Sequence, residues 1–167
     1  MSVEEAGYER VVAFVGANNL GVEIRDFPTS TGTSAEAAYI LGCSVSEIAK
    51  TIGFVCRGES ETPLLIVISG DKKVDTKKLG SIIPCGKAKV MTRDELIRFT
   101  GYAPGEVPPF PHNRGVIAVV DKSVLRFFSV WGAAGSIHAV MHIPTSVFEK
   151  LNFLVVDVAE RFAGGGI

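Results

Sequence analysis

The residue of this sequence best placed to do chemistry is Lys50, in the segment SVSEIAKTIGFVC at positions 44–56. Before it, Ser44 and Glu47 have the spacing of a capping box that starts a helix. After it, β-branched and aromatic residues are typical of a buried strand. The lysine is therefore expected at a junction between a short helix and a strand. Two interpretations fit: a surface lysine that closes the helix, or a cation held at a binding site.

Three glycine-containing segments could bring backbone N–H groups close to a ligand. GYAPGEVPPFPHNRG at 101–115 holds three glycines and four prolines, which predicts a rigid, irregular loop of the kind that often lines binding sites. WGAAGSIH at 131–138 precedes an apolar strand, and its small residues would let a phosphate or an oxyanion approach the backbone. SGDKKVD at 69–75 follows another apolar strand, and its Asp71 is expected to cap the next helix. Each segment taken alone is also explained by an ordinary surface turn.

The familiar templates for nucleophilic and metal catalysis are missing from the sequence. It contains no GxSxG, no HExxH and no GxxxxGK[ST] motif. His138 and His142 are four residues apart, which on a strand separates their α-carbons by about 13 Å, too far to bind one ion. Cys43, Cys56 and Cys85 form no CxxC pair and are expected to be reduced core residues. We therefore expect no metal and no cofactor.

The charge pattern limits the kind of nucleic-acid contact that is possible. The formal net charge of −1 excludes a general polyanion binder, so any contact with nucleic acid must use a local patch. A cluster of lysines provides one candidate patch. It consists of Lys72, Lys73, Lys77 and Lys78, with Lys87 and Lys89 further along the chain. A solvated helix face is the simpler explanation of such a run.

The positions of the expected elements indicate one mixed α/β domain over residues 1–167. Helices are expected at 4–20, 34–42, 74–83 and 93–101, with capping boxes at Thr33, Ser44 and Thr92. Strands are expected at 22–27, 87–91, 116–121, 127–131, 137–143 and 153–158, and the runs at 51–56 and 63–69 predict an antiparallel hairpin. The tail at 163–167 is expected to be loose. The N-terminal segment lacks the features of a secretory leader and no run is long enough to span a membrane, so a soluble cytoplasmic protein is expected.

Several of these segments occur in the order and spacing of one family. The segments TSAEAAYILG, EIAKT, VISGDKKVDTKKLG, TGYAPGEVPPF and WGAAG together resemble the YbaK/ProX-type aminoacyl-tRNA deacylases, the freestanding relatives of the prolyl-tRNA synthetase editing domain. The resemblance covers about residues 30–160. It implies a convoluted, barrel-like, largely antiparallel mixed sheet flanked by helices. It also implies hydrolysis of a mischarged amino acid from the 3′ end of tRNA. Because the net charge is near neutral, tRNA affinity is expected to be modest or to be helped by a partner such as an aminoacyl-tRNA synthetase.

The resemblance further implies which residues form the site. Lys50 would be the catalytic residue, either acting on the ester or positioning the RNA. The charge pattern, not the resemblance, suggests that Lys72, Lys73 and Lys77 contact the tRNA backbone. The residues implied in substrate binding are Ser69, Gly70, Asp71, Gly101, Tyr102, Gly105, Pro108, Pro109, Gly132, Ala134, Gly135, Ser136 and His138. SGD replaces the PGD of many relatives, which leaves the identity of the amino acid open, with Ala or Cys on tRNA(Pro) as the first hypothesis.

Two other functions remain compatible with the sequence. One is a non-catalytic module that binds an aminoacyl-adenylate-like or nucleotide ligand, although such a module would have no need for Lys50. The other is a hydrolase of small free esters or amides, which the missing nucleophile and metal motifs disfavour. The expected mechanism of deacylation needs no covalent intermediate, because an aminoacyl ester is already activated by its ribose leaving group.

Overall fold

The computed structural model describes residues 2–83 and 87–161, so Cys85 and the tail at 163–167 lie outside the described residues. Within the described ranges, the helices are α1 (Val3–Asn18), α2 (Ser34–Leu41), α3 (Thr76–Ile82), α4 (Arg93–Thr100) and α5 (Ser146–Lys150), with 3₁₀ turns η1 (Val45–Glu47) and η2 (Val124–Arg126). The strands are β1 (Glu23–Asp26), β2 (Ala49–Arg57), β3 (Glu61–Ser69), β4 (Lys87–Val90), β5 (Ile117–Asp121), β6 (Ser129–Ala133), β7 (Ala139–Pro144) and β8 (Leu154–Val156).

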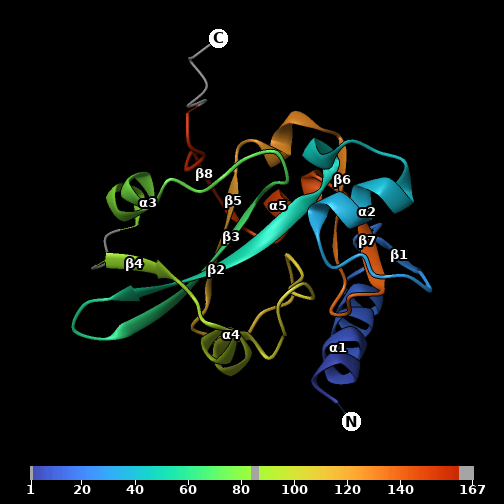
Figure 1. Cartoon of the computed structure of the whole chain (residues 1–167), viewed down its shortest axis with the longest axis horizontal. Coiled ribbons are helices and arrows are strands. Elements are labelled where there is room, and N and C mark those ends of the chain that lie inside the picture. Colours follow the sequence, from blue (N-terminus) through green and yellow to red (C-terminus); the bar gives the residue numbers. More distant parts are fainter. Residues whose placement is uncertain (1, 84–86, 162–167) are drawn as a thin grey trace.

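The described strands form two sheets. The large sheet has the order β4-β2-β3-β5-β8 and the small sheet the order β1-β7-β6. Figure 1 shows the small sheet on the right of the molecule, beside α1 and α2. Within the large sheet β5 runs parallel to β3 and β8, whereas the other pairs in both sheets are antiparallel. The expected mixed α/β fold is confirmed, and its strands form two sheets rather than one closed barrel.

The capping boxes mark helix starts as expected. Thr92 and Glu95 cap α4 reciprocally, because each side chain accepts a hydrogen bond from the other residue's backbone N–H. Thr33 caps α2 by accepting from the N–H of Glu36 at 3.1 Å. The box at Ser44 starts only η1, after which the chain turns directly into β2. Local polar contacts thus fix where the chain enters each of these elements.

The predicted hairpin is confirmed and is longer than expected. β2 and β3 pair antiparallel over nine residues each, from Ala49 opposite Ser69 to Arg57 opposite Glu61. Lys50 is therefore the second residue of β2, just beyond η1, at the end of the hairpin away from its turn. Because the strand begins at Ala49, the backbone at Lys50 is held by the sheet.

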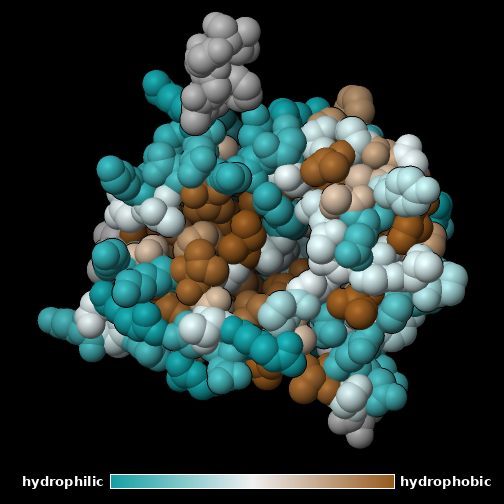
Figure 2. Space-filling view, viewed as in Figure 1, coloured by the Kyte–Doolittle hydropathy of each residue, from teal (hydrophilic) through white to brown (hydrophobic). Residues whose placement is uncertain are grey.

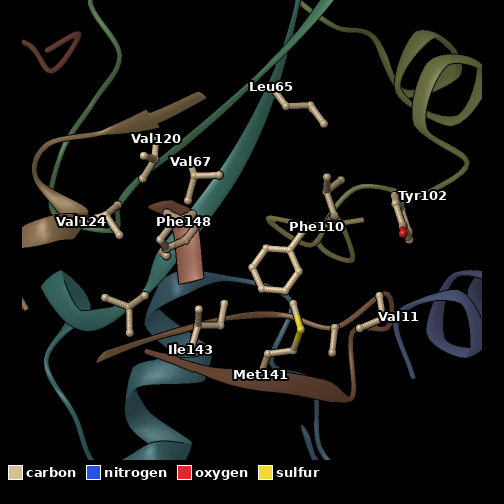
Figure 3. Close-up of a cluster of buried hydrophobic side chains, with 14 of the residues drawn as sticks. Val11, Leu65, Val67, Tyr102, Phe110, Val120, Val124, Met141, Ile143 and Phe148 are labelled. Atoms are coloured by element: carbon tan, nitrogen blue, oxygen red, sulfur yellow. The ribbon is translucent and has the colours of Figure 1, made fainter. Parts of the chain in front are cut away.

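The main core lies between the two sheets. Figure 3 shows Phe110, from the loop at 101–115, between Leu65 and Val67 of the large sheet and Met141 of the small sheet. A second cluster covers the other face of the large sheet, where residues such as Ile66 pack near α3. On the face drawn in Figure 2, apolar side chains gather over the middle of this sheet, bordered by hydrophilic ones. Burial of both faces explains why β3 reads as a continuous apolar run.

Four local expectations need correction. Cys56, which was expected to be reduced, is disulfide-bonded. The N-cap of α3 is Asp75, which accepts from the N–H groups of Lys77 and Lys78, whereas Asp71 pairs with Arg126 at 2.9 Å. The first helix ends at Asn18 rather than near residue 20, because the next residue, Asn19, already adopts a left-handed conformation with φ of 47°. The strand expected at 127–131 is β6, which starts at residue 129 and extends through residue 133, so the turn that follows starts two residues later than expected.

Candidate active site

A pocket of about 260 Å³ opens between the two sheets, and four segments far apart in the chain form its walls. These are the loop before α2 with the start of that helix, the start of β2, the loop at 101–115, and the strands β6 and β7. The lining residues are Thr31, Gly32, Thr33, Ser34, Ala37, Ile48, Ala49, Lys50, Thr51, Gly105, Val107, Trp131, Gly132, Ala133 and Val140. Of these residues only Lys50 has an ionisable side chain.

The ammonium group of Lys50 is held weakly by the protein. Its Nζ donates to the carbonyl oxygen of Gly70 at 3.4 Å, which is a long hydrogen bond. Partial burial lowers the pKa of Lys50 from its ordinary value, the carboxylate of Asp71 opposes this shift, and Lys73 adds to it. Because its one partner is distant, the ammonium keeps hydrogen-bonding capacity for a ligand.

The Gly70 carbonyl that accepts from Lys50 is positioned by the close packing of the end of β3 against η1. Gly70 follows β3, and its N–H donates to the carbonyl of Ile48 at 2.7 Å. A side chain at position 70 would collide with the carbonyl oxygen of Val45. Glycine is therefore required for the end of β3 to pack against η1 beside the pocket.

Two further glycines allow the loop at 101–115 to close one side of the pocket. A Cβ added at Gly132 would lie 3.0 Å from Cγ of Pro109, and one added at Gly105 would lie 3.1 Å from the carbonyl oxygen of Gly32. Gly105 also has φ of 84°, a conformation that glycine adopts without strain. The loop therefore packs closely on β6 through the Pro109 ring and on the segment before α2 through backbone atoms.

The structure brings together only part of the predicted site. Lys50, Gly105 and Gly132 line the pocket. Gly70 and Asp71 act on Lys50 from outside the lining, the first as hydrogen-bond acceptor and the second through its charge.

Other predicted residues have contacts elsewhere. Tyr102 is fully buried, and its hydroxyl donates to the carbonyl of Pro111 at 2.9 Å. Ser136 donates to a carboxylate oxygen of Glu4 at 2.9 Å, at the start of α1. Gly101 is the C-cap of α4. These contacts fix the course of the loop and of the turn after β6.

The remaining predicted residues also lie outside the pocket lining. Pro108, Pro109, Ala134, Gly135 and Ser69 are buried, while His138 is half-buried. In the lysine patch, Lys73 and Lys77 are exposed and Lys72 is half-buried. Their assignment to substrate or tRNA contacts stays a prediction.

Sequence reasoning missed several lining residues. The segment TSTGTS at 29–34 reads as a polar turn before α2, and its role as a pocket wall follows only from the fold. Trp131 stands directly before the glycines of the candidate turn, so its position in the sequence could have indicated that it lines the pocket. Thr51 follows Lys50, and its buried hydroxyl oxygen has no hydrogen-bond partner within the described part of the chain.

The described residues show neither a metal centre nor a membrane-spanning helix. No group of three or more His, Cys, Asp or Glu side chains among them is placed to hold a metal ion. His142 instead approaches Ser129 Oγ through its Nε2 at 2.9 Å and stacks on Trp131. No helix in the same ranges is both long and apolar enough to cross a membrane.

Comparison with known proteins supports an interpretation of this pocket. The sequence matches the aminoacyl-tRNA editing domain family over residues 29–151, which includes all four walls of the pocket. The chain belongs to this family. Its members of the YbaK/ProX type are aminoacyl-tRNA deacylases, and the chain is accordingly an enzyme that hydrolyses aminoacyl-tRNA.

Individual relatives agree with the family assignment. The chain is 33% identical over 131 residues to an uncharacterized protein, YwhH, of Bacillus subtilis strain 168, covering 78% of this chain and 82% of that protein. It is 26% identical over 92 residues to the proline–tRNA ligase of Limosilactobacillus fermentum, covering 54% of this chain and 16% of the ligase. A crystal structure of a proposed trans-editing enzyme for prolyl-tRNA synthetase superposes with a TM-score of 0.81 at 29% identity, covering 93% of this chain and 98% of that one.

Proposed function

We propose that this editing domain removes a small, wrongly attached amino acid such as alanine or cysteine from tRNA, with tRNA(Pro) as the first acceptor to test. The observation that carries the proposal is the position of Lys50, which among the described residues is the one ionisable side chain lining a pocket of about 260 Å³. Likeness to a trans-editing enzyme and to part of proline–tRNA ligases supports the choice of tRNA. The site of action would be the cytoplasm, where an aminoacyl-tRNA synthetase could hand over the substrate.

The chemistry requires an attacking water and stabilisation of one developing negative charge. The water oxygen bonds to the ester carbonyl carbon, the bond to the ribose oxygen breaks, and that ribose oxygen takes up a proton. Lys50 supplies positive charge near the carbonyl or the adjoining phosphate, and the backbones at Gly105 and Gly132 can approach the oxyanion because no side chain covers them.

The size of the pocket supports a small amino acid. Ligand pockets for drug-sized molecules have volumes of roughly 300–1,000 Å³, and this one lies below that range at about 260 Å³. Its walls at Ile48, Val107 and Val140 are apolar. Apolar walls distinguish one methylene by only about 1–3 kcal/mol, so graded rates on Ala, Cys and Ser are expected rather than absolute selectivity.

The test is a deacylation time course on tRNAs charged separately with alanine, cysteine, serine and proline. Lys50→Ala should lower the rate on the preferred substrate by at least about a hundredfold, the size typical for loss of one charge-stabilising group. Lys150→Ala is the matched control, because Lys150 is exposed on α5 and lies outside the pocket lining. Hydrolysis by Lys50→Ala at the wild-type rate would remove Lys50 from the mechanism. If the folded wild-type protein binds charged tRNA but hydrolyses none of these four aminoacyl-tRNAs, the proposed substrate range is wrong.

A further inference from the structure

The outer face of the small sheet carries a row of planar side chains next to the pocket. Pairing places Trp131 of β6 opposite His142 of β7, and His142 opposite Glu23 of β1. Arg25 follows two residues after Glu23 and therefore points to the same face. Alternate residues on the inner face belong to the main core, namely Ile24, Val130, Met141 and Ile143. The row thus faces away from the main core, while Trp131 packs at its edge against a separate small cluster that includes Ala37 and Ile48.

These planar groups are stacked. The rings of Trp131 and His142 lie 4.3 Å apart between centroids with an angle of 28° between their planes. The guanidinium carbon of Arg25 lies 5.0 Å from the centroid of the same indole ring, which is a cation–π contact. A salt bridge of 3.3 Å to Glu23 helps to hold the guanidinium in place, and the Arg25 side chain remains 49% exposed. The cluster therefore carries one guanidinium, which is paired with a carboxylate, and its half-exposed rings lie beside the exposed Arg25 side chain.

The row is continuous with the pocket. Trp131 belongs to both, and Val140, on the same face as His142, lines the pocket as well. At about 260 Å³ the pocket is small for a ligand site, and we take it to hold only the esterified end of a tRNA. The nucleotides that precede this end must leave the pocket across a neighbouring surface.

We propose that Arg25, Trp131 and His142 form a stacking platform for the unpaired nucleotide immediately preceding the terminal, aminoacylated one. The inference rests on the proposed function, because it takes the ester to lie in the pocket. Aromatic rings and arginine planes bind single-stranded bases through their π faces. The guanidinium also provides a donor for the adjoining phosphate. The platform orients the 3′ end so that the ester enters the pocket beside Lys50.

Trp131 is the only tryptophan of the chain, which provides a direct probe. The trinucleotide CCA, which carries no amino acid, should quench the fluorescence of Trp131 in a saturable titration. Arg25→Ala and His142→Ala should each raise the dissociation constant for CCA about tenfold, the size expected for the loss of one stacking partner. Arg25→Lys keeps the charge without the plane and should resemble Arg25→Ala more than wild type.

Arg98→Ala is the matched control. Arg98 is also an exposed arginine placed over an aromatic ring, at 4.3 Å from the centroid of Phe99, and it forms a salt bridge of 3.2 Å with Glu61. It lies on α4, outside the pocket lining. Its replacement should leave CCA binding unchanged, which separates an effect of the platform from a general loss of surface charge.

A kinetic measurement completes the test. The ratio of kcat/KM for aminoacyl-tRNA to kcat/KM for the aminoacyl ester of adenosine alone should fall about tenfold in Arg25→Ala and in His142→Ala, because only the tRNA has a preceding nucleotide. An unchanged ratio together with unchanged CCA binding in both variants would overturn the platform while leaving the deacylase function intact. Saturable CCA quenching by a protein that hydrolyses none of the tested tRNAs would support the platform and count against the proposed substrates.

Discussion

The contact between Gly132 and Pro109 determines how closely the loop at 101–115 packs on β6, and Gly132→Ala tests it. The added Cβ would lie 3.0 Å from Cγ and 3.1 Å from Cδ of Pro109, and 3.3 Å from Cδ1 of Ile143. Carbon atoms in favourable contact are about 3.5–4.0 Å apart, so the loop must move by roughly 0.5–1 Å. Pro109 is buried in a loop with four prolines and cannot rotate away as a flexible side chain would.

The displacement has a measurable cost in stability and in activity. Overpacking of this kind costs about 1–3 kcal/mol, which for a chain of this length lowers Tm by roughly 2–10 °C. The same loop carries Gly105 and Val107, which line the pocket, so kcat/KM should fall by up to about a hundredfold, as expected for a misplacement near 1 Å. Thermal unfolding and the deacylation assay measure the two effects independently.

Two companion variants make the test specific. Gly16→Ala introduces the same methyl group on α1, where nothing lies within 4 Å, and should instead stabilise the protein by about 0.5–1 kcal/mol. Pro109→Ala combined with Gly132→Ala should recover part of the lost Tm, because the two side chains share one contact. Wild-type Tm and activity in Gly132→Ala would refute the packing of the loop against β6.

Two other predictions concern acid stability and tRNA binding. Burial lowers the pKa of His112 from 6.5 to about 4, with a smaller opposing contribution from the hydrogen bond to the Pro109 carbonyl and a smaller lowering from Arg10. The unfolded chain therefore binds a proton that the folded one excludes, so the free energy of unfolding should fall as pH drops from 6.5 toward 4, by up to about 3 kcal/mol at 1.36 kcal/mol per pKa unit. His112→Gln should flatten this dependence in urea unfolding at about pH 7 and about pH 5; an equal loss of stability in both proteins would contradict the assignment. The double variant Lys72→Ala, Lys73→Ala should weaken tRNA binding. The slope of the logarithm of the association constant against the logarithm of the salt concentration should fall by about one for each phosphate that the protein no longer neutralises. An unchanged slope would mean that the tRNA backbone binds to another part of the surface.

Much of the local structure could be predicted because its causes lie within a few residues. The caps at Thr33 and Thr92 start helices by contacts between residues three apart, and the apolar runs around the polar turn at 57–62 pair as a hairpin. Where two such signals compete, the sequence is less informative. Both Asp71 and Asp75 precede α3, and only the folded chain, in which Arg126 pairs with Asp71, shows that Asp75 is the cap.

The composition of the pocket could not be predicted from local signals, because distant pairings create it. β1 meets β7 across more than a hundred residues, with Glu23 opposite His142, and this pairing sets which side chains of the small sheet face outward. The role of Trp131 depends on that register, since a shift by one residue would turn its indole into the core. Lys50 and Gly105 could be associated before the fold was known only through the family resemblance.

Because the pocket walls come from distant parts of the chain, the pocket can form only late during synthesis of the protein. The walls come from residues 31–34, 48–51, 105–107 and 131–133, and the last of them is held in place by pairing with β7. A chain that is still growing on the ribosome cannot complete the pocket before residue 144, the end of β7, has emerged. The growing chain is itself joined to tRNA by an ester of the kind that this enzyme cleaves. Late assembly of the final wall means that hydrolytic activity first appears only after the segment that ends at residue 144 has been made.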